Sequence, residues 1–138
     1  MYDLSRFTAA HQSDYATALA EIRSGRKTSH WMWYIFPQLK GLGRSSTSMY
    51  YGIDSIDEAI AFLQDPYLGG HLREITQALM ELGQSDPTAI FGRPDDMKLR
   101  SCMTLFACAA PEESLFQDVI DGYFGGRMDN RTLRMLGR

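Results

Sequence analysis

Cationic, imidazole and aromatic side chains gather in one short stretch of the chain. Arg26, Lys27 and His30 lie within five residues and are followed by both tryptophans of the protein, Trp31 and Trp33. Arginine can bind a phosphate or carboxylate through two hydrogen bonds, lysine supplies a point charge, and an indole ring can stack on a planar ring. This stretch therefore predicts a site for an anionic, ring-bearing ligand. The alternative is a solvated turn whose cations complement a helix C-terminus, with the rings in the core.

A glycine loop follows shortly afterwards. Gly41 and Gly43 would let the backbone approach phosphate oxygens closely, and Arg44 and Ser45 supply further donors. The spacing matches neither a P-loop nor a dinucleotide fingerprint. We predict that the loop belongs to the same anion site, the alternative being a flexible turn.

Two carboxylates at predicted helix starts could take part in catalysis. Asp96 belongs to an acidic pair just ahead of Lys98, and Asp129 follows a Gly-Gly-Arg turn. Either carboxylate could accept hydrogen bonds from ribose hydroxyls or stabilise an oxocarbenium-like transition state. Both residues also fit a purely structural role in helix capping or at a helix dipole.

Composition excludes several classes of protein. A net charge of −3 and a pI near 5.5 argue against the broad basic surface that binds duplex nucleic acid. The histidines lack metal-ligand spacing, Cys102 and Cys108 fit reduced core thiols, and no bound metal or cofactor is predicted. Because the chain shows neither a signal sequence nor an apolar run of membrane-spanning length, we expect a cytoplasmic protein.

The fold class predicted from the pattern is mainly α. The 138 residues, with 44% hydrophobic content, fit a single domain over residues 1–138. Capping residues, prolines and glycines indicate a compact bundle of six or seven helices with at most a minor β element. The predicted helices begin at Ser13, Ser55, Asp65, Asp95, Pro111 and Asp129, with short turns at 3–7 and 86–92. The run from 31 to 36 fits a buried strand or a helical turn, and 38–51 fits a loop.

The motif Gly-Arg-Lys-Thr-Ser-His-Trp-Met-Trp-Tyr-Ile-Phe-Pro-Gln-Leu, residues 25–39, resembles the signature of domain of unknown function 1810, a bacterial and fungal family. Further matches lie at 41–43 and Ser45, at 65–69 and over 96–106. The opening Asp-Leu and Arg-Phe pairs also match. The resemblance covers almost the whole chain and implies membership of that family.

The helical layout with a basic, aromatic N-terminal site also resembles, more distantly, the NADAR-like superfamily of ADP-ribose metabolism. That resemblance implies pyrophosphate binding by Arg26, Lys27 and Arg44. It also implies glycosidic cleavage by Asp96 or Asp129, with Lys98 orienting the carboxylate. We therefore expect a phosphate-bearing small-molecule partner, a nucleotide or ADP-ribose-like compound that is bound and could be hydrolysed. The alternative function is a non-enzymatic interaction module in which the aromatics dock a protein.

Overall fold

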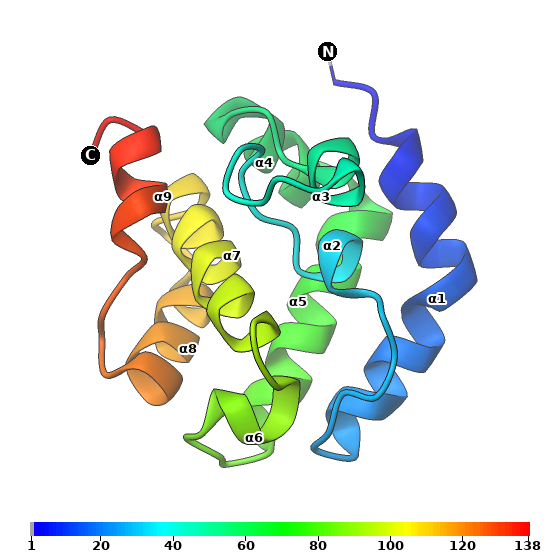
Figure 1. Ribbon diagram of the computed structural model, residues 1–138, viewed down its shortest axis with the longest axis vertical. Helices are drawn as coiled ribbons and strands as arrows, with labels where there is room; N and C mark the ends of the chain where they lie inside the picture. Colours follow the sequence, from blue (N-terminus) through cyan, green and yellow to red (C-terminus); the bar gives the residue numbers. More distant parts are fainter. Residues whose placement is uncertain (1) are drawn as a thin grey trace.

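The computed structural model describes residues 2–138, and its regular secondary structure is almost entirely helical (Figure 1). The only pairing between extended segments that it describes in this range is one parallel bridge between Leu39 and Ile53. The helices are α1 (Ser5–Arg23), α2 (Met32–Ile35), α3 (Ser46–Tyr51), α4 (Ile56–Gln64), α5 (Pro66–Glu81), α6 (Pro87–Phe91), α7 (Asp95–Ala109), α8 (Ser114–Phe124) and α9 (Asn130–Met135).

Two central helices organise the core. α5 packs against α1, α4 and α8, and α7 packs against α4, α6, α8 and α9. Figure 1 shows α1 on one side of the bundle and α8 and α9 on the other, with α2 and α7 in front. From residue 101 to 107 every side chain of α7 is buried, as expected for a helix enclosed by its neighbours. No helix within residues 2–138 has the length and apolar character of a membrane span.

The expected number of helices is too low, because residues 2–138 form nine. The segment predicted as a loop contains α3, which Ser45 caps by accepting a hydrogen bond from the Ser48 backbone N–H at 3.1 Å. The predicted helix start at Ser13 is also wrong. Ser13 lies in the middle of one continuous helix, α1, because the buried His11 continues the apolar stripe between Phe7 and Tyr15.

Most of the other predicted helix starts are confirmed by cap hydrogen bonds. Ser55, Asp65, Asp86 and Asp129 each accept from a backbone N–H in the first turn of the following helix, at 3.0 to 3.3 Å. These bonds satisfy donors that have no partner inside the helix. The start predicted for α7 at Asp95 is confirmed, whereas α8 begins at Ser114 rather than at Pro111.

A pair of histidines joins α1 to α5 at the edge of the core. His11 is only 2% exposed, and its Nε2 lies 2.8 Å from the carbonyl oxygen of Tyr34 in α2. A carbonyl can only accept, so Nε2 carries the hydrogen and Nδ1 accepts one from Nδ1 of His71, 2.9 Å away. In this tautomer of His71, a proton on Nδ1 of His11 would place two N–H groups against each other. Burial, with a smaller repulsion from His71, lowers the pKa of His11 to about 4.

Acid is therefore expected to weaken the fold through His11. Its folded-state pKa lies below the unfolded value of about 6.5, so the unfolded chain binds more protons between these limits. The contribution is fully present above pH 6.5 and is lost as the pH falls towards 4, by about 2–3 kcal/mol in the free energy of unfolding. Urea unfolding at several pH values measures this loss. It should shrink in His11→Gln and persist in a control, His30→Gln, at an exposed position; an equal slope in all three proteins would contradict the assignment.

Candidate functional site

Two adjacent hollows, which we call the two chambers of a groove, lie between α2, α7 and the loop at 38–43. The Trp33 chamber has a volume of about 260 Å³ and is lined by Lys27, His30, Met32, Trp33, Arg93, Pro94, Asp95 and Lys98. The Asp129 chamber has a volume of about 320 Å³ and is lined by Gln38, Leu42, Gly43, Pro94, Met97, Lys98, Ser101, Asp129 and Arg131. Pro94 and Lys98 line both chambers, so they form the partition.

The short helix α2 sends the two tryptophans to different places. Two residues along a helix correspond to about 200° of rotation, so an i, i+2 pair does not share a side. Trp31 is 1% exposed and packs in the core, where its Nε1–H donates to Oε1 of Glu21 at 3.0 Å. Trp33 is half-buried and lines the groove. The sequence pattern fitted either a strand or a helical turn at residues 31–36, and the structure has the helix α2 there. Trp33 is the tryptophan that lines the site.

Glu21 holds the backbone that leads into α2. Its carboxylate accepts hydrogen bonds from Thr28 N at 2.7 Å, Ser29 N at 2.9 Å and Ser29 Oγ at 2.6 Å, besides the Trp31 indole. Burial alone would raise the pKa of Glu21, but these donors together lower it to about 2. Glu21 was not predicted as part of the site. Its position in the last turn of a helix could have indicated a role, because an acidic residue there opposes the helix dipole and needs another partner.

Asp95 joins two lysines at the mouth of the Trp33 chamber. Its Oδ2 lies 2.8 Å from Nζ of Lys27, and its Oδ1 lies 3.5 Å from Nζ of Lys98. The Lys27 side chain is only 6% exposed, and it also donates to the carbonyl of Ser29 and lies over the Trp31 ring. Lys27 is thus held by the protein itself. Lys98 shares the Asp95 carboxylate with Lys27, and its ammonium keeps donors for a ligand. Together the two lysines and Asp95 carry a net charge of +1.

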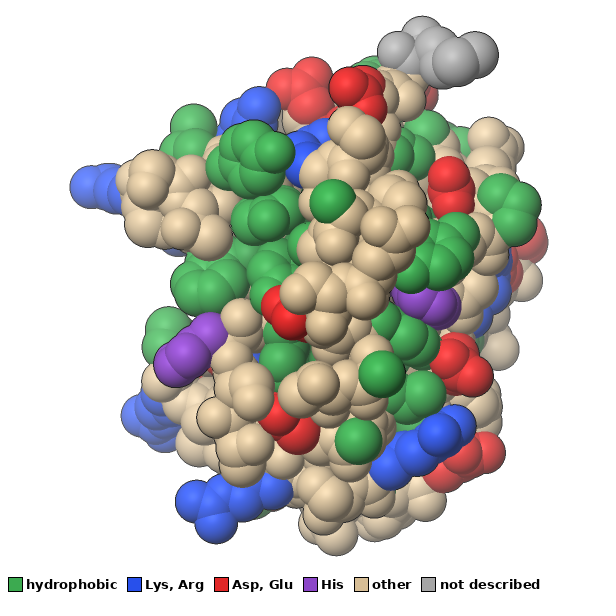
Figure 2. All heavy atoms as spheres, turned by 90° about the vertical axis from the view of Figure 1, so that its right-hand side faces the viewer, with side chains coloured by type: hydrophobic (Ala, Val, Ile, Leu, Met, Phe, Trp, Pro, Cys, Tyr) green, Lys and Arg blue, Asp and Glu red, His purple; other side chains and the backbone are tan. Residues whose placement is uncertain are grey.

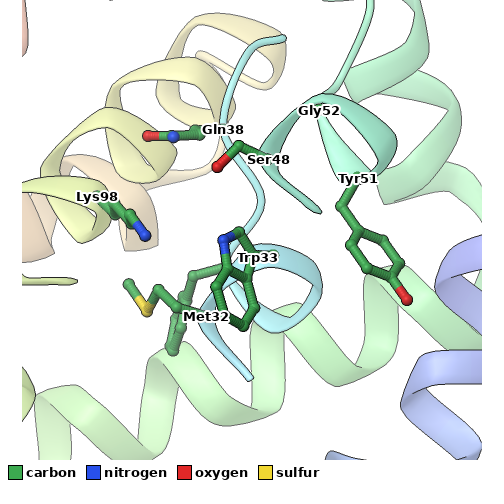
Figure 3. A pocket seen from close by; sticks show the side chains of 8 residues that line it. Met32, Trp33, Gln38, Ser48, Tyr51, Gly52 and Lys98 are labelled. Atoms are coloured by element: carbon green, nitrogen blue, oxygen red, sulfur yellow. The ribbon is translucent and has the colours of Figure 1, made fainter. Parts of the chain in front are cut away.

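The ammonium group of Lys98 also lies over Trp33, 5.3 Å from the centre of its ring. Figure 3 shows these two side chains facing each other from α7 and α2 across a small recess, with Gln38 and Ser48 beside them. Tyr51 lines the same recess on the side of Trp33 away from Lys98. In the space-filling view of Figure 2, hydrophobic side chains lie in a hollow at the left edge. The rest of that face mixes acidic and basic groups.

The structure brings together six of the residues predicted for the site: Lys27, His30, Trp33, Gly43, Lys98 and Asp129. Arg26, Gly41 and Arg44 lie outside both chambers, as does Ser45, which caps α3. Gly43 has a packing role as well, since a Cβ there would lie 2.6 Å from Oγ of Ser48.

The carboxylates predicted for catalysis differ in whether one of their oxygens remains free to bind a ligand. Asp96 is 5% exposed, and its two oxygens accept from Thr88 Oγ1 at 2.7 Å and Met97 N at 2.8 Å. It lines an open hollow of about 370 Å³ with Arg93, Pro94 and Met97, which shares Arg93 and Pro94 with the Trp33 chamber and Pro94 and Met97 with the Asp129 chamber. Asp129 uses only Oδ2, which accepts from Ser101 and Thr132; its Oδ1 has no hydrogen-bond partner among residues 2–138. Lys98 pairs with Asp95 rather than with either of them.

Four polar side chains of the groove were not predicted from sequence, namely Gln38, Arg93, Ser101 and Arg131. Gln38 follows a proline, Arg93 precedes one, Ser101 lies inside a predicted helix, and Arg131 lies two residues after a predicted cap. They reach the groove only because α7 and α9 fold against the segment that follows α2. No local signal could have placed them there.

The likeness to other proteins covers the whole fold. The family described as "Protein of unknown function (DUF1810)" matches residues 1–136. The chain belongs to the DUF1810 family. A crystal structure titled as the conserved hypothetical protein Rv1873 from Mycobacterium tuberculosis is 44% identical, with a TM-score of 0.96 over 99% of this chain and 98% of that one. No curated protein matches the chain. The family expected from the tryptophan motif is thus confirmed, and neither description names an activity for DUF1810.

Proposed function

We propose that the groove binds a small molecule that carries a phosphate and a planar ring, such as a nucleotide or an ADP-ribose-like compound. The observation that supports this most directly is Lys98, a groove-facing ammonium beside the ring of Trp33 at the partition of the two chambers. A cation and an aromatic side chain at one point of a concave surface match the two parts of such a ligand.

The charge balance of the groove supports an anionic ligand. Lys27, Arg93, Lys98 and Arg131 line the two chambers, against the carboxylates of Asp95 and Asp129. The chain as a whole is acidic, with a net charge of −3. A locally basic groove in an acidic protein concentrates anions there without attracting nucleic acid over the whole surface.

Hydrolysis of an N-glycosidic bond in the bound ligand is the reaction we propose for this site. In NAD, the bond between the anomeric carbon and the nicotinamide nitrogen would break, the oxygen of water would bond to that carbon, nicotinamide would leave as the neutral base, and the proton lost by the water would pass to solvent. Of the predicted carboxylates, Asp129 keeps one unpaired oxygen for the sugar or the water, whereas both oxygens of Asp96 are engaged. Release of nicotinamide from NAD would report this step.

Binding is tested by thermal shift and calorimetry with NAD, ADP-ribose, nucleotides and sugar phosphates, because a ligand of the native state raises its stability. Lys98→Met keeps the length and apolar stem of the side chain and removes its charge. We expect it to weaken binding of the best phosphate compound at least tenfold. Lys40→Met is the matched control, since Lys40 is exposed and lines neither chamber.

Two outcomes would count against the proposal. If no phosphate compound shifts the melting temperature, protein docking becomes the better hypothesis. If Lys98→Met and Lys40→Met weaken binding equally, the ligand lies elsewhere on the protein.

A further inference from the structure

The two chambers of the groove offer different chemistry. The Trp33 chamber presents the Trp33 ring and the Met32 side chain together with cations, a lining suited to a flat, partly apolar group. The Asp129 chamber is lined by the polar residues Gln38, Ser101, Asp129 and Arg131 and by the apolar residues Leu42, Pro94 and Met97, with no aromatic residue among them. A flat ring therefore finds an aromatic partner only in the Trp33 chamber, whereas the Asp129 chamber offers hydrogen-bonding partners beside an apolar wall.

Lys98 determines which chemical group lies between the two ends of the ligand. Lys98 lines both chambers, and its ammonium lies beside Trp33, so a ligand that spans the chambers passes this residue between its two ends. The ammonium has three donors, and its ion pair with Asp95, at 3.5 Å, is a long one. The remaining donors can take phosphate oxygens.

The unpaired oxygen of Asp129 specifies the polar end. Oδ2 of this residue is engaged by Ser101 and by Thr132 at the start of α9, and this fixes the carboxylate in place. Oδ1 has no partner within the described chain and belongs to a side chain that lines the chamber. An ionised carboxylate oxygen only accepts hydrogen bonds, so it selects a donor such as a sugar hydroxyl over another phosphate.

We infer that the ligand has three parts: a planar ring in the Trp33 chamber, a phosphate or pyrophosphate on Lys98 and a hydroxyl-bearing sugar in the Asp129 chamber. The inference rests on the proposed function and narrows it to ring–phosphate–sugar compounds, as opposed to mononucleotides that end at the phosphate. The volumes agree, because each chamber, at about 260 and 320 Å³, is at or below the lower end of ordinary ligand sites, whereas the two together reach their middle range.

The test compares ADP with ADP-ribose, which differ by the terminal ribose. We expect calorimetry to give at least tenfold tighter binding of ADP-ribose to the wild-type protein, since a site built to bond a hydroxyl discriminates against a ligand without it. In Asp129→Asn the ratio of the two affinities should fall below about threefold. Asparagine keeps the shape and one oxygen for Thr132, and it places an amide donor where the free acceptor was.

The matched control is Asp118→Asn, at an exposed position on α8 that lines neither chamber; it should keep the wild-type ratio. Thermal melting checks that each variant is folded. If Asp129→Asn is unfolded, Gln38→Leu tests the same chamber with the same ratio.

Three results separate this inference from the function on which it rests. Equal affinities of the wild-type protein for ADP and ADP-ribose would overturn the three-part ligand and leave phosphate binding standing. A wild-type ratio that survives in the Asp129 chamber variants would place the sugar elsewhere and also overturn it. Failure of both compounds to bind would remove the proposed function itself.

Discussion

Replacing Trp31 with alanine is expected to lower the free energy of unfolding by about 3–5 kcal/mol, the range for deleting a large buried aromatic side chain. The indole is 1% exposed and packs near Phe36, with ring centres 6.1 Å apart. Its loss would leave a cavity and would also remove a donor from the Glu21 carboxylate, 3.0 Å away. Urea denaturation at neutral pH measures the change.

Trp33 provides the matched comparison two residues away. Its side chain is half-buried and faces the groove, so Trp33→Ala should cost about 1–2 kcal/mol of stability, less than the loss at Trp31. The binding of phosphate compounds should instead weaken at least tenfold, because the planar group loses its aromatic wall. If the two variants were equally destabilised, the division of the pair into a core residue and a site residue would be wrong.

A second large effect is expected at Glu58, whose side chain is 5% exposed at the start of α4. Its carboxylate lies 3.3 Å from the guanidinium of Arg6 and accepts the Asp54 N–H at 2.7 Å. Arg6 in turn donates to the carbonyls of Tyr50 and Gly52 and so ties α1 to the end of α3. Glu58→Ala leaves a largely buried cation without its partner, and the expected loss is about 3–5 kcal/mol.

The ion pair of Arg73 and Glu113 is the control for this prediction. Its nitrogen and oxygen are closer, at 2.6 Å, yet the side chains are 39% and 30% exposed. Water and salt weaken such a pair, so Glu113→Ala should cost about 1 kcal/mol or less. A loss at Glu58 no larger than the loss at Glu113 would show that burial does not set the strength of these contacts.

Helix starts could be predicted from sequence wherever a short polar side chain reaches its own backbone. Asp65 and Asp86, each followed by proline, begin helices as expected, because the cap bond involves only neighbouring residues. The prediction from sequence was wrong where a contact with a residue far along the chain determines the structure. Residue 11 reads as polar, yet His11 is buried in the middle of α1 because His71 and the Tyr34 carbonyl complete its hydrogen bonds.

The candidate site likewise contains residues that could be predicted from sequence and residues that could not. The local run that contains Lys27, His30 and Trp33 could be recognised from residue types alone, and all three line the groove. The periodicity of that run could not say which tryptophan faces outward, since the answer depends on whether the segment is strand or helix. Arg93 and Arg131 could not be found, because tertiary packing alone brings them to the groove.

Lys98 stands near the start of α7, whose continuation from residue 101 to 107 is enclosed on all sides. A backbone anchored in this way cannot shift without disturbing the whole core. The site is therefore preorganised, and its main adjustable part is the lysine side chain, which can turn from Trp33 towards an anion. Ligand binding should then cost little conformational entropy. Structures with and without ligand should superpose closely in their backbones and differ in the rotamer of one residue.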